Sequence, residues 1–203
     1  SRCDGESYWT ADVVQSIESL RQTLLDARTL LAVLQKESPQ PVGVAGLSLG
    51  GALAEVLTCL EPGFAFSAPF IAHMDLGALV ADAPVLGAMR EDLLRFGWTP
   101  RDFGAFTKRL GWDELRPLIP PERICLFAAR DDHFFRASVV RAMWRRWQRP
   151  RIHWYPASHM GFLVHLPDAV GRLRNFVDGL ELTAPSGRPR SQRAKPSRPR
   201  RRG

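Results

Sequence analysis

The stretch Val44-Ala45-Gly46-Leu47-Ser48-Leu49-Gly50-Gly51 (VAGLSLGG) places one serine between two glycines, where an apolar run ends and an Ala/Leu-rich run begins. The run before the serine, residues 41–47, is short and apolar, as is typical of a strand buried in a parallel sheet. The run after it, residues 51–60, predicts a helix that ends at Glu61-Pro62-Gly63. We therefore expect Ser48 to be a nucleophile on a sharp strand–helix turn, or else a small residue that merely fits there.

The rest of the chain continues this alternation of strands and helices. Short helical fragments separated by prolines over residues 73–121 indicate an inserted lid or a set of surface helices. The pattern predicts an α/β fold with a mostly parallel sheet flanked by helices. The remaining predicted elements are helices over residues 10–37, 137–147 and 167–180 and strands over residues 64–70, 123–129 and 151–156.

The net charge of +7 belongs to the C-terminal tail. From Ala184 onward there are eight basic residues and no acidic one, which leaves 20 basic against 21 acidic residues in the rest of the chain, a net charge of −1. The tail has no apolar residue larger than proline, so it cannot offset its own ordering entropy. We expect a single domain over residues 1–183 and a disordered basic tail over residues 184–203. Nucleic-acid binding is disfavoured, because only this tail would supply the cations.

The cysteines and the apolar runs exclude several other classes of protein. Cys3, Cys59 and Cys125 form no Cys-x-x-Cys or Cys/His spacing, so neither a disulfide framework nor a zinc site is predicted. Cys59 and Cys125 lie in apolar stretches and are expected in the core, which favours a reducing, cytoplasmic location. No apolar run is long enough for a membrane span.

Polar side chains follow the ends of three predicted strands. Ser48 follows the first, Asp131-Asp132-His133 follow the strand over 123–129, and His159 follows the strand over 151–156. Ligands of an open α/β sheet bind at the carboxyl ends of its strands, so these residues are expected to meet at one edge. A serine hydroxyl needs an imidazole to take its proton, and a carboxylate orients that imidazole. The order predicts Ser48 as nucleophile, His159 as general base and an aspartate as the acid.

The residues next to Ser48 support the same interpretation. Gly46 and Gly50, two before and two after the serine, are expected to remove side chains that would collide with the neighbouring strand and helix. The backbone N–H of Leu49, at the start of the following helix, would point to the place where an oxyanion forms. Leu49 is therefore the predicted backbone donor of the oxyanion hole.

Three segments of the chain resemble the α/β-hydrolase superfamily. Residues 44–54 (VAGLSLGGALA) resemble its nucleophile elbow, residues 126–135 (LFAARDDHFF) its strand–acid turn, and residues 155–163 (YPASHMGFL) its histidine loop. The resemblance covers residues 41–180. It implies a serine hydrolase that acts on a small-molecule ester or acyl substrate through an acyl-enzyme and needs neither a cofactor nor a metal. The surroundings of Asp132 and His159 also resemble polyhydroxyalkanoate-synthase-type acyltransferases.

The acid and the role of a second histidine stay open at this point. In the family, the acid stands three residues after a small residue. Counting from Ala129 selects Asp132, which we favour, and counting from Ala128 selects Asp131, which would otherwise support the loop backbone. His73 with Asp75 would either border the pocket or form a turn.

The chain also departs from the family pattern before the elbow. An α/β hydrolase normally has four more strands there, and the loop after the third supplies a second oxyanion donor, whereas one predicted helix precedes the elbow here. Losing one such donor costs about 10²–10³ in rate. We therefore expect the C-terminal portion of a larger protein or a fragment. Three functions stay open: ester hydrolysis, acyl transfer with the same residues, or a catalytically silent, N-terminally truncated hydrolase fragment.

Overall fold

The fold is described by a computed structural model, which covers residues 13–82, 86–109, 111 and 114–181. Its sheet has four strands in the order β1-β2-β3-β4, and neighbouring strands are parallel. The strands are β1 (Val44–Leu47), β2 (Ser67–Phe70), β3 (Cys125–Ala129) and β4 (Arg151–Tyr155). The predicted α/β fold with a mostly parallel sheet is confirmed. The predicted basic tail over residues 184–203 and Cys3 lie outside the described residues.

Helices separate the strands along the chain. α2 begins at Leu49, two residues earlier than predicted, because the N–H of Ala52 already donates to the carbonyl of Ser48 at 2.9 Å. β1 begins at Val44 and is shorter than the predicted run over 41–47. The α-helices are α1 (Val13–Glu37), α2 (Leu49–Leu60), α3 (Leu76–Asp82), α4 (Gly87–Arg95), α5 (Pro100–Arg109), α6 (Ala137–Arg146) and α7 (Leu166–Asp178), and the 3-10 helices are η3 (Pro121–Arg123) and η4 (Met160–His165).

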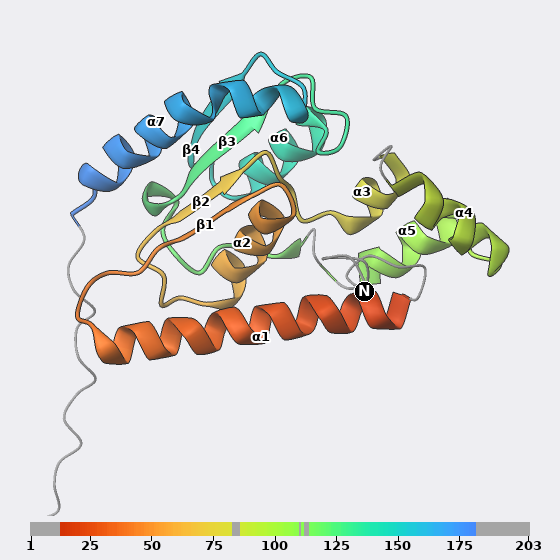
Figure 1. Ribbon diagram of the computed structural model, residues 1–203, viewed down its shortest axis with the longest axis horizontal. Helices are drawn as coiled ribbons and strands as arrows, with labels where there is room; N and C mark the ends of the chain where they lie inside the picture. The colour runs from red at the N-terminus through yellow and green to blue at the C-terminus, as the bar shows by residue number, and fades with distance from the viewer. Residues whose placement is uncertain (1–12, 83–85, 110, 112–113, 182–203) are drawn as a thin grey trace, which may run out of the picture.

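Helices cover both faces of the sheet, and α7 lies on the face opposite α2 (Figure 1). On the α7 face, Phe70 of β2 and Phe127 of β3 pack against Phe162 and Phe176. On the other face, residues of β3 pack against both α2 and α6. That second cluster contains Val56, Cys59, Met74, Ile119, Ile124, Leu126, Met143 and Trp147. Because β3 is buried on both faces, its sequence is an uninterrupted run of apolar residues.

β1, the strand that leads to Ser48, is an edge strand. It pairs with β2, and no strand in the described part of the chain pairs with its other side. Ala45 and Leu47 of β1 are exposed, whereas every residue of β2 and β3 is buried. The long helix α1 runs beside α2 (Figure 1) and buries Leu31 against Leu57.

The predicted insertion over residues 73–121 contains α3, α4 and α5, which lie together beside the sheet (Figure 1). Val80, Met89, Leu93 and Phe103 form a small core of their own. Leu79 of α3 belongs to a cluster with residues of α1 and of the loop after β3, so the insertion packs close to the carboxyl end of the sheet. Its role as a lid stays a prediction. Across the residues described, no helix is long and apolar enough to cross a membrane.

Candidate active site

Ser48 occupies a strained turn between β1 and α2. Its φ of 55° and ψ of −118° lie where a residue other than glycine is rarely found. Its N–H donates to the carbonyl of Phe70 on β2 at 3.0 Å, and its own carbonyl accepts the first bond of α2. These bonds hold the turn on both sides, and the half-buried side chain of Ser48 lies at the carboxyl end of the sheet.

The glycines that this turn requires are Gly46 and Gly51. A Cβ atom on Gly46 would collide with the carbonyl of Gly50, and one on Gly51 would lie 2.7 Å from the Cβ of Ala72. A Cβ atom on Gly50 would meet nothing within 4 Å. The prediction that Gly50 removes a collision is therefore wrong. Gly50 is exposed on the first turn of α2, whereas Gly51 faces the end of β2.

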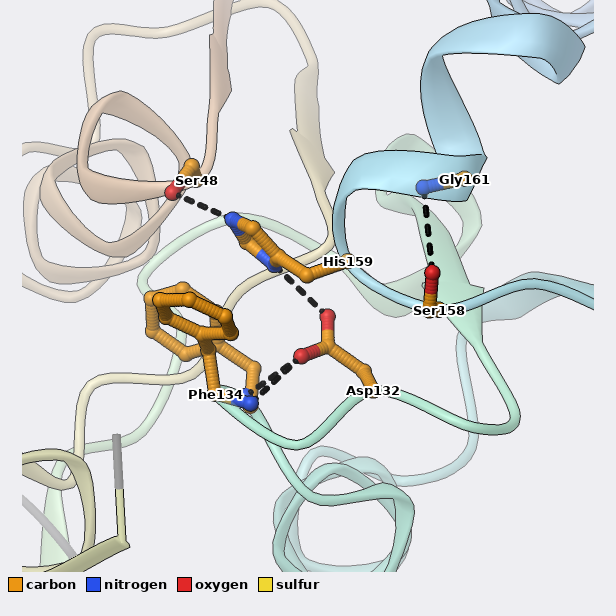
Figure 2. Close-up of polar contacts among 7 residues, drawn as sticks. Ser48, Asp132, Phe134, Ser158, His159 and Gly161 are labelled. Atoms are coloured by element: carbon orange, nitrogen blue, oxygen red, sulfur yellow. Dashed lines mark hydrogen bonds and ion pairs between the residues drawn. The ribbon is translucent and has the colours of Figure 1, made fainter. Parts of the chain in front are cut away.

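Ser48, His159 and Asp132 are joined by a continuous chain of hydrogen bonds (Figure 2). The Oγ of Ser48 lies 2.9 Å from Nε2 of His159, and Nδ1 of the same ring lies 2.8 Å from Oδ2 of Asp132. A carboxylate can only accept hydrogen bonds, so we assign the ring proton to Nδ1. Nε2 then accepts the hydrogen bond of the Ser48 hydroxyl. The structure thus brings three of the sequence-predicted site residues together.

The carboxylate that faces the imidazole is that of Asp132. Its side chain is 1% exposed, and its second oxygen, Oδ1, accepts the N–H of Phe134 at 2.7 Å and of Phe135 at 2.9 Å. Together with the imidazole, these donors offset the cost of burying the carboxylate. Asp131 is exposed, and its N–H donates to the carbonyl of Ala157 at 3.1 Å, so its backbone joins the acid loop to the histidine loop.

Leu49 is the first residue of α2 and follows Ser48 directly. The N–H groups of a helix's first turn have no acceptor within the helix, so the N–H of Leu49 needs a partner outside α2, and its role as an oxyanion donor stays a prediction. His73 and Asp75 belong to the turn before α3. Nδ1 of His73 accepts the N–H of Asp75 at 3.2 Å, and Oδ1 of Asp75 accepts the N–H of Ala78 at 2.9 Å.

Two aromatic residues at the site were missed by sequence reasoning. The ring of Phe134 is stacked on the imidazole of His159, with centroids 4.6 Å apart and an angle of 25° between the planes. The ring of Phe135 lies 5.4 Å from the same imidazole at 36°. A sequence signal does exist, because an aspartate commonly accepts the amide N–H two residues further on. Phe134 stands at that distance from Asp132.

Sequence comparison finds relatives of this chain in Mycobacterium tuberculosis. The chain is 30% identical over 190 residues to two uncharacterised proteins, MT2702 of strain CDC 1551 and Rv2627c of strain H37Rv. Each match covers 90% of this chain and 43% of the relative. The chain therefore spans less than half the length of the curated relatives it matches. No protein-family model matches the chain.

The fold itself has a counterpart among solved structures. The esterase Pf2001 from Pyrococcus furiosus, an α/β-hydrolase-fold protein, matches with a TM-score of 0.53 and 17% identity over 76% of this chain and 60% of the esterase. This chain has the α/β-hydrolase fold. A hydrolase from Pseudomonas aeruginosa PA01 is a more distant match, with a TM-score of 0.47 and 18% identity over 79% of this chain and 72% of that one. At the level of the fold, the resemblance to α/β hydrolases is confirmed.

Helix α2 of this α/β-hydrolase-fold chain also buries a carboxyl group. Glu55 of α2 is 1% exposed, and its Oε2 has no hydrogen-bond partner in the described structure. Burial raises the pKa of Glu55 well above its usual range, and a hydrogen bond from the backbone of Met74 opposes that effect in part. Glu55 therefore holds its proton more tightly than an exposed glutamate does.

Within the described residues, no group of three or more His, Cys, Asp or Glu side chains is placed to hold a metal ion.

Proposed function

We propose that this chain carries the active site of a serine hydrolase that cleaves carboxylic esters of small molecules through an acyl-enzyme. The observation that carries the proposal is the hydrogen-bonded chain from Ser48 through His159 to Asp132. It begins at a serine held in a strained turn between a strand and a helix. The fold shared with the Pf2001 esterase supports the same class of reaction.

In the first half of the reaction, Ser48 is the nucleophile and His159 the general base. The Oγ atom forms a bond to the ester carbonyl carbon as its proton moves to Nε2, and the carbonyl π electrons move onto oxygen. The oxyanion would form beside the N–H of Leu49, and the carboxylate of Asp132 stabilises the imidazolium. The electrons on the oxyanion then re-form the carbonyl bond, the bond to the alkoxy oxygen breaks with its electron pair, and that oxygen takes the proton from Nε2 and leaves as the alcohol.

In the second half, water replaces the alcohol. His159 takes a proton from water as the water oxygen attacks the acyl carbon. The bond between the acyl carbon and Oγ then breaks with its electron pair as the carbonyl re-forms, Oγ takes the proton from Nε2, and the carboxylic acid leaves. An alcohol or thiol in place of water would complete an acyl transfer with the same residues. Product analysis with added alcohol or thiol acceptors separates the two reactions.

The test is covalent labelling with a fluorophosphonate probe, carried out on this chain as it exists. The unmodified chain should be labelled, because its serine is activated by His159, and the Ser48→Ala variant should not be labelled. Ser158→Ala is the matched control, since that serine lies next to His159 but its Oγ accepts the N–H of Gly161. Labelling of Ser48→Ala as strong as that of the unmodified chain would overturn the proposal. An unlabelled native chain would instead support a catalytically silent fragment.

A reducing, cytoplasmic setting is part of the same proposal. Cys59 and Cys125 are free thiols, and both are buried. A free thiol persists most readily where glutathione and thioredoxin keep cysteines reduced. Cell fractionation that recovers the protein outside the cytoplasm would contradict this assignment.

A further inference from the structure

Phe134 and Phe135 each contact both Asp132 and His159. The N–H groups of Phe134 and Phe135 donate to Oδ1 of Asp132, and both phenyl rings lie against His159. We propose that Phe134 is a positioning residue for His159. Its ring face keeps the imidazole in line between Asp132 and Ser48 and stabilises the imidazolium that forms when Ser48 gives up its proton. This inference rests on the proposed function.

The first step of the argument is geometric. His159 is hydrogen-bonded at both ring nitrogens, Nδ1 and Nε2, which are separated by Cε1. Two such bonds fix a line through the imidazole, but they do not by themselves prevent the ring plane from tilting about that line. A phenyl ring stacked at 4.6 Å and 25° opposes this motion, because tilting would drive the edge of the imidazole into the face of Phe134. Figure 2 shows the Phe134 side chain beside the imidazole.

The second step is electrostatic. His159 is 8% exposed, so few water molecules can solvate it when it becomes a cation. The face of an aromatic ring carries partial negative charge and attracts a cation whose centre lies within about 6 Å of the ring centroid. Most of this attraction appears only after the imidazole is protonated. It therefore acts more on the transition state than on the resting enzyme, which is the condition for raising kcat.

The two phenylalanines differ in how deeply they are buried. Phe135 is 3% exposed, meets the ring of His73 edge-on at 5.0 Å, and belongs to the cluster that contains Leu20 and Leu79. Replacing it would open a cavity in the core and obscure any effect on His159. Phe134 packs against the same cluster but is only half-buried, so its replacement measures the effect of the ring on His159 with less disturbance to packing.

Three variants test the proposal by kinetics. Phe134→Leu keeps an apolar side chain without a π face, Phe134→Tyr keeps the face, and Phe66→Leu removes a half-buried ring at the opposite end of β2. Phe134→Leu should lower kcat and the rate of fluorophosphonate labelling by about 2- to 30-fold, the range expected for one cation–π contact, with KM unchanged. Phe134→Tyr and Phe66→Leu should react at the native rate. Native rates for Phe134→Leu, or an equal loss in Phe134→Tyr, would overturn the stabilising role.

A second measurement does not depend on catalysis. In protein labelled with ¹⁵N-histidine, the exchange of the Nδ1 proton of His159 with solvent reports how firmly the imidazole is held on Asp132. We expect faster exchange in Phe134→Leu than in the native chain, with Phe134→Tyr restoring the native rate. Equal exchange in all three proteins would overturn the positioning role. If the native chain is not labelled by the probe, the proposed function fails, and the exchange measurement alone decides the role of Phe134.

Discussion

Asp132 holds Nδ1 of His159 at 2.8 Å with one carboxylate oxygen, while its other oxygen accepts two backbone N–H groups. Both carboxylate oxygens are therefore hydrogen-bonded, and the two cannot change places without breaking these bonds. This arrangement sets the orientation of the imidazole from the loop after β3. It also allows the effect of replacing Asp132 by asparagine to be predicted.

An Asp132→Asn variant should lose the activity that depends on Ser48. The amide nitrogen cannot take the place of Oδ1, because it would face the N–H groups of Phe134 and Phe135. It must then face Nδ1 of His159, which forces the ring proton onto Nε2 and leaves no acceptor for the Ser48 hydroxyl. Such a change in tautomer costs about 10⁴-fold in rate. We expect a loss of this order in fluorophosphonate labelling. The exposed Asp131→Asn variant should keep the native rate, and an equal loss there would contradict the assignment of the acid.

Two alanine substitutions near Ser48 should have opposite outcomes. Gly46→Ala places a Cβ against the carbonyl of Gly50 and should distort the turn, lowering both the melting temperature and the labelling of Ser48. Gly50→Ala meets no atom within 4 Å and lies in a helix, where alanine is favoured over glycine by about 0.5–1 kcal/mol. It should leave labelling unchanged and keep or raise the melting temperature. Calorimetry with parallel labelling measures both, and a destabilised Gly50→Ala would contradict the geometry of the turn.

The buried Glu55 should make stability depend on pH. In the unfolded chain a glutamate ionises at about pH 4.3. The pKa of Glu55 in the folded protein is higher, so the folded state binds more protons between the two values. The free energy of unfolding contributed by this site is therefore largest below about pH 4.3 and falls as pH rises toward the pKa of the folded state.

Glu55→Gln removes this titration and keeps an oxygen that can accept the N–H of Met74. We expect the variant to gain stability over the native chain as pH rises from acidic to neutral, and to lose that advantage in acid. Thermal unfolding measured across this pH range tests the prediction. Glu91→Gln, at an exposed position on α4, serves as the control. A constant difference between Glu55→Gln and the native chain at every pH would contradict the prediction.

The two buried cysteines should resist alkylation in the folded protein. Burial raises the pKa of the Cys59 thiol and of the Cys125 thiol to about 12. At pH 8 about one molecule in 10⁴ then carries the reactive thiolate at either site. Iodoacetamide should modify neither residue in the folded chain and both in denaturant, as read by mass spectrometry. Rapid modification of Cys125 in the folded state would show that β3 is less protected than its burial implies.

Much of the fold was predictable from local patterns. Apolar spacing indicates the four strands and the helices that follow them, because burial on both faces of a parallel sheet produces short uninterrupted apolar runs such as the one that contains β3. The ends of these elements were less well predicted. β1 begins at Val44 rather than at residue 41, where its N–H bonds to the distant carbonyl of Phe66. α2 begins directly after Ser48, because the carbonyl of Ser48 already accepts the N–H of Ala52.

The sequence by itself determined the order of strands and helices and brought Ser48, His159 and the Asp131–Asp132 pair into consideration, because these depend on local spacing and on the rule that ligands lie at strand ends. Only the tertiary structure decided which aspartate faces the imidazole, that Gly51 rather than Gly50 is constrained, and that phenyl rings flank His159. These features depend on contacts between segments that are distant in sequence: 111 residues separate Ser48 from His159, and 27 separate His159 from Asp132. No local sequence pattern specifies in which direction a side chain points from the turn at the end of a strand. That direction is set by the residues that the side chain contacts after folding.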